Sequence, residues 1–214
     1  MRPNILVSTA AAALLGLTAC GEKPGGAADQ QNMPVNAAQD AAGAVTGLAT
    51  AAVGAVSTDA FVRDAAMGDM YEIEAAKMAL ARSQSAEVKQ LAQMILTDHT
   101  ASSEKMKQLA SSGQVKEPLP TELDERRKGL LDNLRGSGGT DFDGRYIKQQ
   151  AAAHHEAYLL MTGYGSAGQD PTLKAFANEV APKIKMHMDM AQKLGGEAVA
   201  HTGEATAPPA APAR

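Results

Sequence analysis

The sequence predicts an all-α protein: an up-down four-helix bundle made from two helical hairpins, with a short extra helix in the central crossover. Three observations support this class. Four long segments repeat apolar residues at helical spacing, no segment alternates β-branched and aromatic residues as a strand does, and the two halves of the folded region resemble each other in residue type. The expected domain is residues 58–194, a usual size for one core.

The first hairpin contains two amphipathic helices. The first is expected from about Asp59 to Arg82, with Thr58 as its N-cap, and its apolar positions are Phe61, Ala65, Ile73, Ala76 and Leu80. The second begins after Ser85 and ends near Ser111, and its apolar positions are Val88, Leu91, Ile95, Met106 and Leu109. The residues that end it are Gly113, Pro118 and Pro120.

A short helix and the second hairpin complete the pattern. The short helix is expected over Thr121–Gly136, with Thr121 as its cap, and the third long helix over about Asp141–Ser166. The fourth opens with Asp170 and Pro171, a good N-cap and first-turn pair, and its apolar seam is Leu173, Phe176, Val180, Ile184, His187, Ala191 and Leu194. Pro182 lies inside this helix and is expected to kink or loosen one turn.

The two hairpins look like copies of one unit. The segment Glu87–Ala92 matches Thr172–Ala177 in type, and each opens the second helix of its hairpin. Phe61 and Phe142 stand near the start of the corresponding first helices. A duplicated hairpin gives the up-down bundle directly.

The first 19 residues have the layout of an export signal. Arg2 precedes an apolar run, Ile5–Leu17, that is too short to span a bilayer. The end of the run, Leu17–Cys20, resembles the lipobox of bacterial lipoproteins, and Cys20 is the only cysteine of the chain. We therefore expect acyl chains, palmitate among them, on Cys20 to anchor the protein in a membrane; the alternative is an ordinary cleaved signal with an incidental cysteine. By the same resemblance Gly21 favours the outer membrane, with the domain facing the periplasm.

Low-complexity segments flank the expected domain. Residues 20–57 are rich in Ala, Gly, Gln and Asn, with few large apolar side chains, and we expect a flexible tether. The alternative is a short membrane-surface helix over Val35–Val56, interrupted by Gly43, Gly47 and Gly54. Residues 195–214, which include His201, are rich in Pro and Ala and are expected to be disordered.

The folded region resembles a known family over about Ala60–Leu194. The matching residues, in the family's order and spacing, are Phe61-Val62, Val88–Ala92, Asp98-His99, Leu119-Pro120, Leu123-Asp124, Phe142-Asp143, Tyr146, His155-Glu156 and Leu173–Ala177. The family is a bacterial one of exported proteins, described as outer-membrane proteins, with a domain of unknown function. The resemblance implies a ferritin-like fold and brings no assigned activity.

Each long helix carries a polar candidate on or beside its apolar stripe. These candidates are Glu72, His99, His155 or Glu156, and His187. In the third helix the stripe passes between His154 and His155, and the family resemblance favours His155 as the interior residue. Burying a neutral polar group without a partner costs about 2–7 kcal/mol. Such groups are therefore expected to meet one another or a ligand inside the bundle.

A transition metal ion is the ligand that these residue types suit. Facing helices of a bundle build metal sites from inward side chains, and imidazole with carboxylate fits Fe, Cu or Zn, and also Ni. Met186 and Met188 flank His187 with thioether donors that suit copper, although methionine is a common core filler. One alternative is a hydrogen-bonded core network that fixes helix register. Another is a metal-dependent oxidoreductase.

Several classes of function lack their signatures. A ferritin-type di-iron site needs a Glu-x-x-His pair on each of two helices, but the residues three before His99, His155 and His187 are Leu96, Ala152 and Ile184. Hydrolase and phosphate-loop motifs are also missing. With 20 Lys+Arg against 24 Asp+Glu and no basic patch, a nucleic-acid partner is not expected. The sequence thus predicts a lipid-anchored, non-enzymatic envelope protein that binds a transition metal in storage, sensing or stress protection. It identifies no protein partner.

Overall fold

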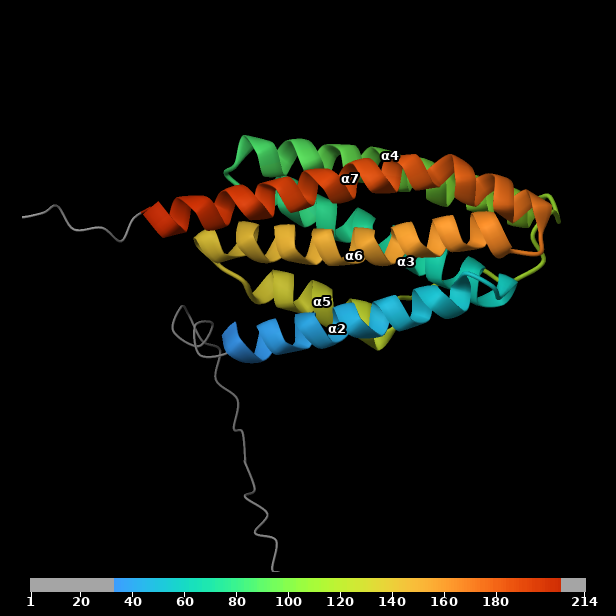
Figure 1. The fold of residues 1–214 in the computed structure, drawn as a ribbon, viewed down its shortest axis with the longest axis horizontal. Helices are drawn as coiled ribbons and strands as arrows, with labels where there is room; N and C mark the ends of the chain where they lie inside the picture. Colours follow the sequence, from blue (N-terminus) through green and yellow to red (C-terminus); the bar gives the residue numbers. More distant parts are fainter. Residues whose placement is uncertain (1–32, 205–214) are drawn as a thin grey trace, which may run out of the picture.

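Two helical hairpins form the centre of the fold (Figure 1). Helix α3 (Thr58–Arg82) pairs with α4 (Ala86–Ser111), and α6 (Gly139–Ala167) pairs with α7 (Pro171–Glu204). The two hairpins meet through α3 against α6 and α4 against α7. The prediction of an all-α chain of packed helices is therefore confirmed, and no strand occurs between residues 33 and 204.

The computed structural model describes residues 33–204. The expected signal segment 1–19, the expected lipidation site Cys20 and residues 205–214 lie outside this range. Within it, no helix is both long enough and apolar enough to span a membrane. Helix α7 continues through residues 195–204, where the sequence predicted disorder, and it runs past Pro182, which lies on its exposed face.

The helix starts follow local capping chemistry. The side chain of Ser85 accepts the backbone N–H of Val88, as expected for the cap of α4. At α3 the cap is Ser57, which accepts the N–H of Ala60, and Thr58 is the first helical residue. The short helix α5 (Glu125–Gly136) is capped by Asp124, so it begins four residues after the expected Thr121.

A sixth helix lies where the sequence favoured a flexible linker. Helix α2 (Met33–Gly54) packs along α6 and α3, and α5 lies beside it (Figure 1). The glycines that were expected to interrupt this segment lie on its buried face, in the series Gly43, Gly47, Ala51 and Gly54. A Cβ at Gly47 would stand 1.8 Å from the Glu156 carboxylate, and one at Gly54 would stand 2.4 Å from Leu160. These residues are small because α2 lies so close to α6.

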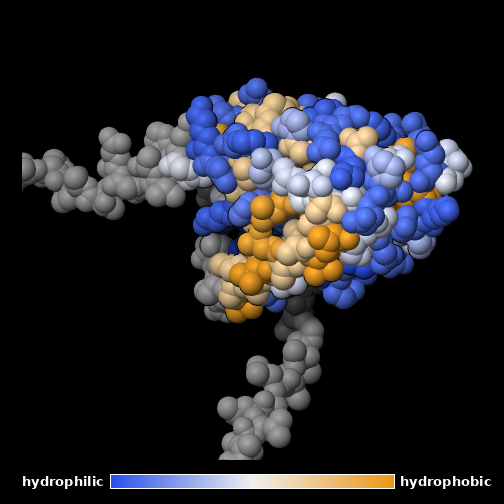
Figure 2. Space-filling model, turned by 45° about the vertical axis from the view of Figure 1, so that its right-hand side comes forward, coloured by the Kyte–Doolittle hydropathy of each residue, from blue (hydrophilic) through white to orange (hydrophobic). Residues whose placement is uncertain are grey.

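The outer face of α2 is apolar and nearly uncharged. Val35, Val45 and Val53 on this helix, and Val56 just after it, are each more than half exposed. Figure 2 shows apolar surface gathered over the lower part of the molecule, where α2 runs. Asp40 is the only charged residue of α2, and it is turned inward to Asn133, Arg145 and Gln149.

The core consists of two apolar clusters with a polar layer between them. One cluster contains the stacked rings of Phe61 and Tyr164 with Phe176 against their edge. The other contains Phe142 and Tyr146. On α4, the buried Ile95 belongs to the second cluster and Met106 to the first, and His99 lies between them. On α6 and α7 too, the buried histidine lies between residues of the first cluster and residues of the second, so the three histidines lie at the same level of the bundle.

Candidate metal centre

Three imidazoles meet in the polar layer. His99 on α4, His154 on α6 and His187 on α7 are at most 3% exposed, and one ring nitrogen from each lies within 4.8 Å of the other two. The ring centroids are 5.2–5.7 Å apart, with the His154 ring nearly perpendicular to the other two. Three helices distant in sequence thus direct the same functional group at one point.

Each imidazole is held by a hydrogen bond on one of its two ring nitrogens. His99 Nδ1 is 2.8 Å from Asp69 Oδ1, His154 Nδ1 is 3.0 Å from the Gln150 carbonyl oxygen, and His187 Nε2 is 3.1 Å from Asp98 Oδ2. A carboxylate and a carbonyl only accept hydrogen bonds, so the ring nitrogen must be the donor in each case. Outer partners of this kind fix the tautomer of metal-binding histidines.

In the neutral form of each ring, the remaining nitrogen carries a lone pair. A proton on His99, which its raised pKa favours, would instead make Nε2 a hydrogen-bond donor to His154. His99 Nε2 and His154 Nε2 face each other at 3.4 Å, and His187 Nδ1 is buried with no hydrogen-bond partner between residues 33 and 204. Lone pairs that converge in a dry interior repel each other unless a proton or a cation lies among them. The apo arrangement is therefore complementary to positive charge.

The spacing fits a small metal ion. A tetrahedral ion about 2.0–2.1 Å from each nitrogen separates neighbouring nitrogens by about 3.3 Å. The His99–His154 separation of 3.4 Å already has this value. A ring nitrogen of His187 lies within 4.8 Å of the other two ligand nitrogens. Three imidazoles leave a fourth position for water or another ligand.

Glu72 lies beside the three imidazoles as a buried carboxyl group. It comes from α3, is 3% exposed, and its Oε1 is 3.7 Å from His154 Nδ1. Its Oε2 is buried and has no hydrogen-bond partner among the described residues. Burial, with smaller contributions from Asp69 and Glu156, raises the pKa of Glu72 to about 7 although His99 opposes the shift. Near neutral pH this carboxyl group can therefore hold or release a proton.

The electrostatics keep two of the three imidazoles neutral. Burial and the neighbouring His99 lower the pKa of His187 to about 4, and burial with both neighbours holds the pKa of His154 well below its ordinary value. Burial also disfavours a charge on His99, but the hydrogen bond and charge of Asp69 outweigh it and raise the pKa of His99. Neutral imidazole is the form that binds metals.

Of the five site residues predicted from sequence, the structure places three in the polar layer and two, His155 and Glu156, outside it. Glu72, His99 and His187 are buried in one layer as expected. The expected interior residue of the third helix was wrong, because His155 is exposed and His154 takes its place. Met186, suggested as a soft donor beside His187, is 41% exposed.

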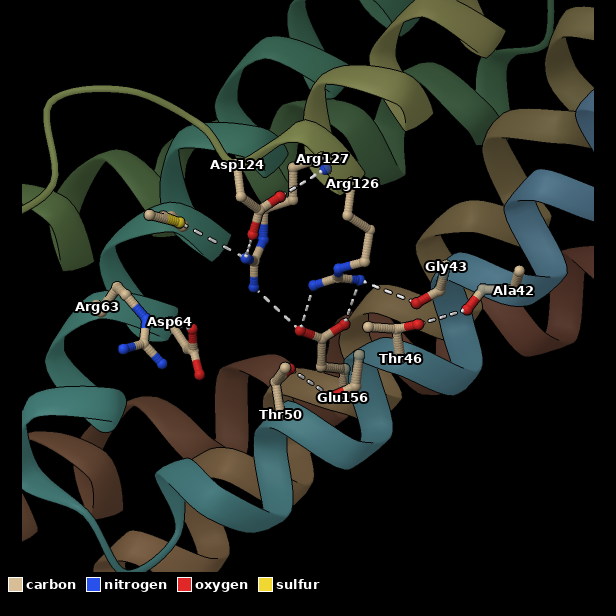
Figure 3. Close-up of polar contacts among 12 residues, drawn as sticks. Ala42, Gly43, Thr46, Thr50, Arg63, Asp64, Asp124, Arg126, Arg127 and Glu156 are labelled. Carbon is tan, nitrogen blue, oxygen red and sulfur yellow. Dashed lines mark hydrogen bonds and ion pairs between the residues drawn. The ribbon is translucent and has the colours of Figure 1, made fainter.

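Glu156, the other candidate on α6, belongs to a different network (Figure 3). Its carboxylate accepts hydrogen bonds from Arg126 at 2.7 and 2.9 Å and from Arg127 at 3.0 Å. Arg126 also donates to the Gly43 carbonyl on α2. Glu156 therefore ties α2, α5 and α6 together, and both of its oxygens are occupied by guanidinium groups.

Sequence reasoning missed Asp69, Gln150 and the correct histidine of α6. Steps of four residues from Tyr146 lead through Gln150 to His154, and steps of four from Phe61 lead through Ala65 to Asp69. Both patterns follow the helical repeat. Strict counting along one buried face could have found all three residues, whereas the family resemblance pointed to the neighbouring position 155.

Comparison with known proteins identifies a family and no activity. Residues 43–194 match the family model described as "Domain of unknown function (DUF4142)", so the chain belongs to that family. No curated protein and no solved structure matches the chain. The match begins at residue 43, inside α2, which agrees with the packing of that helix on the bundle.

Proposed function

We propose that this protein is a lipid-anchored cell-envelope protein whose ferritin-like four-helix bundle binds one transition metal ion through His99, His154 and His187. One observation carries the metal proposal: three buried imidazoles, each held by a hydrogen bond on one ring nitrogen, bring one ring nitrogen apiece within 4.8 Å of the other two. A core network would pair its donors with acceptors. Among the described residues, this layer instead leaves His187 Nδ1 and Glu72 Oε2 without hydrogen-bond partners.

The donor atoms of the site narrow the choice of metal ion. Three nitrogens with a nearby carboxylate suit Zn²⁺, Fe²⁺ or Cu²⁺, and residues 33–204 contain no cysteine whose thiolate would favour Cu⁺. Glu72 is the candidate for a fourth ligand or for the group that accepts a proton from metal-bound water. Its distance from the imidazole nitrogens requires a side-chain movement to coordinate directly. Storage, sensing or protection against metal stress is the role this closed interior site supports best.

The envelope assignment depends on the N-terminal sequence. Residues 17–20 have the lipobox pattern, and Cys20 is the only cysteine. Acyl chains attached there would hold the domain at the membrane surface, and we place it at the outer membrane facing the periplasm. Labelling of cells with an alkyne fatty acid tests this: the wild-type protein takes up the label, and Cys20→Ser loses it. Equal labelling of both proteins contradicts the anchor.

Metal binding is tested on the purified mature chain. The protein is stripped with a chelator, incubated with Zn²⁺, Fe²⁺, Cu²⁺ or Mn²⁺ and desalted, and its metal content is measured by mass spectrometry. We expect about one ion per chain for at least one metal. His99→Ala, His154→Ala and His187→Ala should each lose it.

His155→Ala provides a matched control, because it removes an imidazole from the adjacent, exposed position of the same helix. It should bind metal as the wild type does. Absence of stoichiometric metal in the wild type, or equal loss in His155→Ala and His154→Ala, contradicts the site. In that case the layer is a structural network that fixes helix register, and the three His→Ala variants change only the melting temperature.

A further inference from the structure

A cavity separate from the polar layer lies between α2, α5 and α6. Its volume is about 420 Å³, within the range of about 300–1,000 Å³ typical of small-molecule pockets. It opens to solvent and shares only Glu156 with the candidates predicted from sequence. The His99–His154–His187 layer does not line it.

Small side chains on both facing helices create this space. Ala37, Ala41 and Ala44 line it from α2, and Gly144, Ala152 and Ala153 line it from α6. Close-packed interiors normally fill such positions with larger apolar residues. The result is a cleft with apolar walls, whose water an apolar ligand group displaces favourably.

Polar bridges hold the helices apart on either side of the cleft. Asp40 on α2 binds Arg145 at 2.6 Å and Gln149 at 2.9 Å on α6. Arg126 on α5 links Glu156 on α6 to the Gly43 carbonyl on α2. These long side chains set the helix separation, so the cleft is preformed and does not depend on a ligand to open it.

Two cationic donors at the cleft have unused N–H groups. The Arg145 side chain is 9% exposed and its Nε is buried without a hydrogen-bond partner among residues 33–204. Lys148, one turn along α6, lines the cleft, and the described part of the chain offers it no ion pair or hydrogen bond. The carboxylates of Asp40 and Glu156 are already bonded to other side chains, and Asp141 is exposed.

We propose that this cleft binds an amphiphilic monocarboxylate, such as a medium-chain fatty acid. Its carboxylate accepts a hydrogen bond from Lys148 Nζ beside the Arg145 guanidinium, and its hydrocarbon chain lies along the alanine-lined walls. A monoanion fits better than a dianion, because three carboxylates of the protein already line the cleft together with its three cationic side chains. This binding goes beyond the metal site and needs no metal.

The test compares decanoate with the uncharged decanol by isothermal titration on the purified mature chain. We expect saturable binding of decanoate at one site and weaker binding of decanol. Lys148→Gln removes one exposed charge and should weaken decanoate about two- to fivefold while leaving decanol unchanged. Ala44→Phe fills the cleft and should abolish binding of both.

Ala49→Phe is the matched control, since it adds the same ring on the exposed face of α2 outside the cleft. It should bind both compounds as the wild type does. If circular dichroism shows that Ala44→Phe fails to fold, the decanoate-to-decanol ratio in Lys148→Gln decides. No saturable decanoate binding, equal affinity for decanol in the wild type, or an unchanged ratio in Lys148→Gln overturns the proposal.

Discussion

At the scale of the residue, the hydrogen bond behind each imidazole decides what the metal site can do. Asp69 holds His99 through Nδ1 with both groups buried, and this fixes Nε2 as the nitrogen that faces the other two rings. An asparagine keeps the size of the side chain but removes the negative charge. It also presents either an oxygen or an amino group to the ring, so the tautomer is no longer fixed.

We predict that Asp69→Asn weakens metal binding about 10- to 100-fold, the usual effect of removing an outer-shell carboxylate. Competition with a chromogenic chelator measures the change. Asp64→Asn is the control, because Asp64 is buried on the same helix and its carboxylate contacts Arg63. If metal affinity falls equally in both variants, the loss is due to the negative charge near the site and not to the Asp69–His99 hydrogen bond.

Glu72 makes the stability of the metal-free protein depend on pH. Its pKa is about 7 in the folded protein and near 4.5 when unfolded, so the folded state binds more protons between these values. Stability from this group is therefore lost as pH rises from about 4.5 through 7. His187 acts in the opposite direction: its pKa is about 4 when folded and 6.5 when unfolded, so stability is lost as pH falls through that range.

We predict that Glu72→Gln removes the loss of stability at higher pH and moves the pH of maximum stability upward. The free energy of unfolding of the variant, relative to the wild type, should rise from pH 5 to pH 8 by on the order of 1–3 kcal/mol. Urea unfolding in the presence of a chelator measures it at each pH. Glu74→Gln, exposed on the same helix, should show no such trend. A pH-independent difference between Glu72→Gln and the wild type would contradict the shifted pKa.

At the scale of the element, the glycines of α2 have two opposing effects: they lower helix propensity, and they allow close helix packing. An isolated glycine costs a helix about 1 kcal/mol relative to alanine, which argues for a linker. At Gly47 and Gly54 the residue also lets the α2 backbone lie against α6, and the packing of the helix face outweighs the propensity. The spacing of four and seven residues from Gly43 through Gly47 to Gly54 is helical and was present in the sequence, but spacing does not reveal the partner helix.

Gly47 and Gly43 give a matched pair that tests this packing. A Cβ at Gly47 collides with the Glu156 carboxylate, which Arg126 and Arg127 hold in place, whereas a Cβ at Gly43 meets Leu130 at an ordinary 3.5 Å. We predict that Gly47→Ala destabilises the protein by about 1–3 kcal/mol and that Gly43→Ala is neutral or stabilising by up to about 1 kcal/mol. Denaturant unfolding measures both. Equal effects would mean that α2 does not pack on Glu156.

At the scale of the whole molecule, the bundle is two apolar cores separated by one polar layer. The four amphipathic segments predicted α3, α4 and α6 to within a few residues, because burial of a continuous stripe forces helical spacing. They missed α2, and α7 continues to Glu204, ten residues past its predicted end at Leu194. The stripes of α4 and α7 also located His99 and His187. They could not choose between His154 and His155, since two adjacent residues both border a broad stripe and only the packing of α6 against its four neighbouring helices selects one.

The same layer makes metal binding a property of the assembled fold. The three imidazoles lie on α4, α6 and α7, so an unfolded chain does not hold them together, and an ion that binds only the folded state stabilises it by mass action. At a free metal concentration about 100 times Kd the gain is about 2.7 kcal/mol, which raises the melting temperature of a domain of this size by about 5–11 °C. We predict this shift for the chelator-treated wild type on adding the cognate metal. His187→Ala should show no shift, while His155→Ala should match the wild type; a shift of the same size in His187→Ala would mean that the stabilising ion binds elsewhere on the protein.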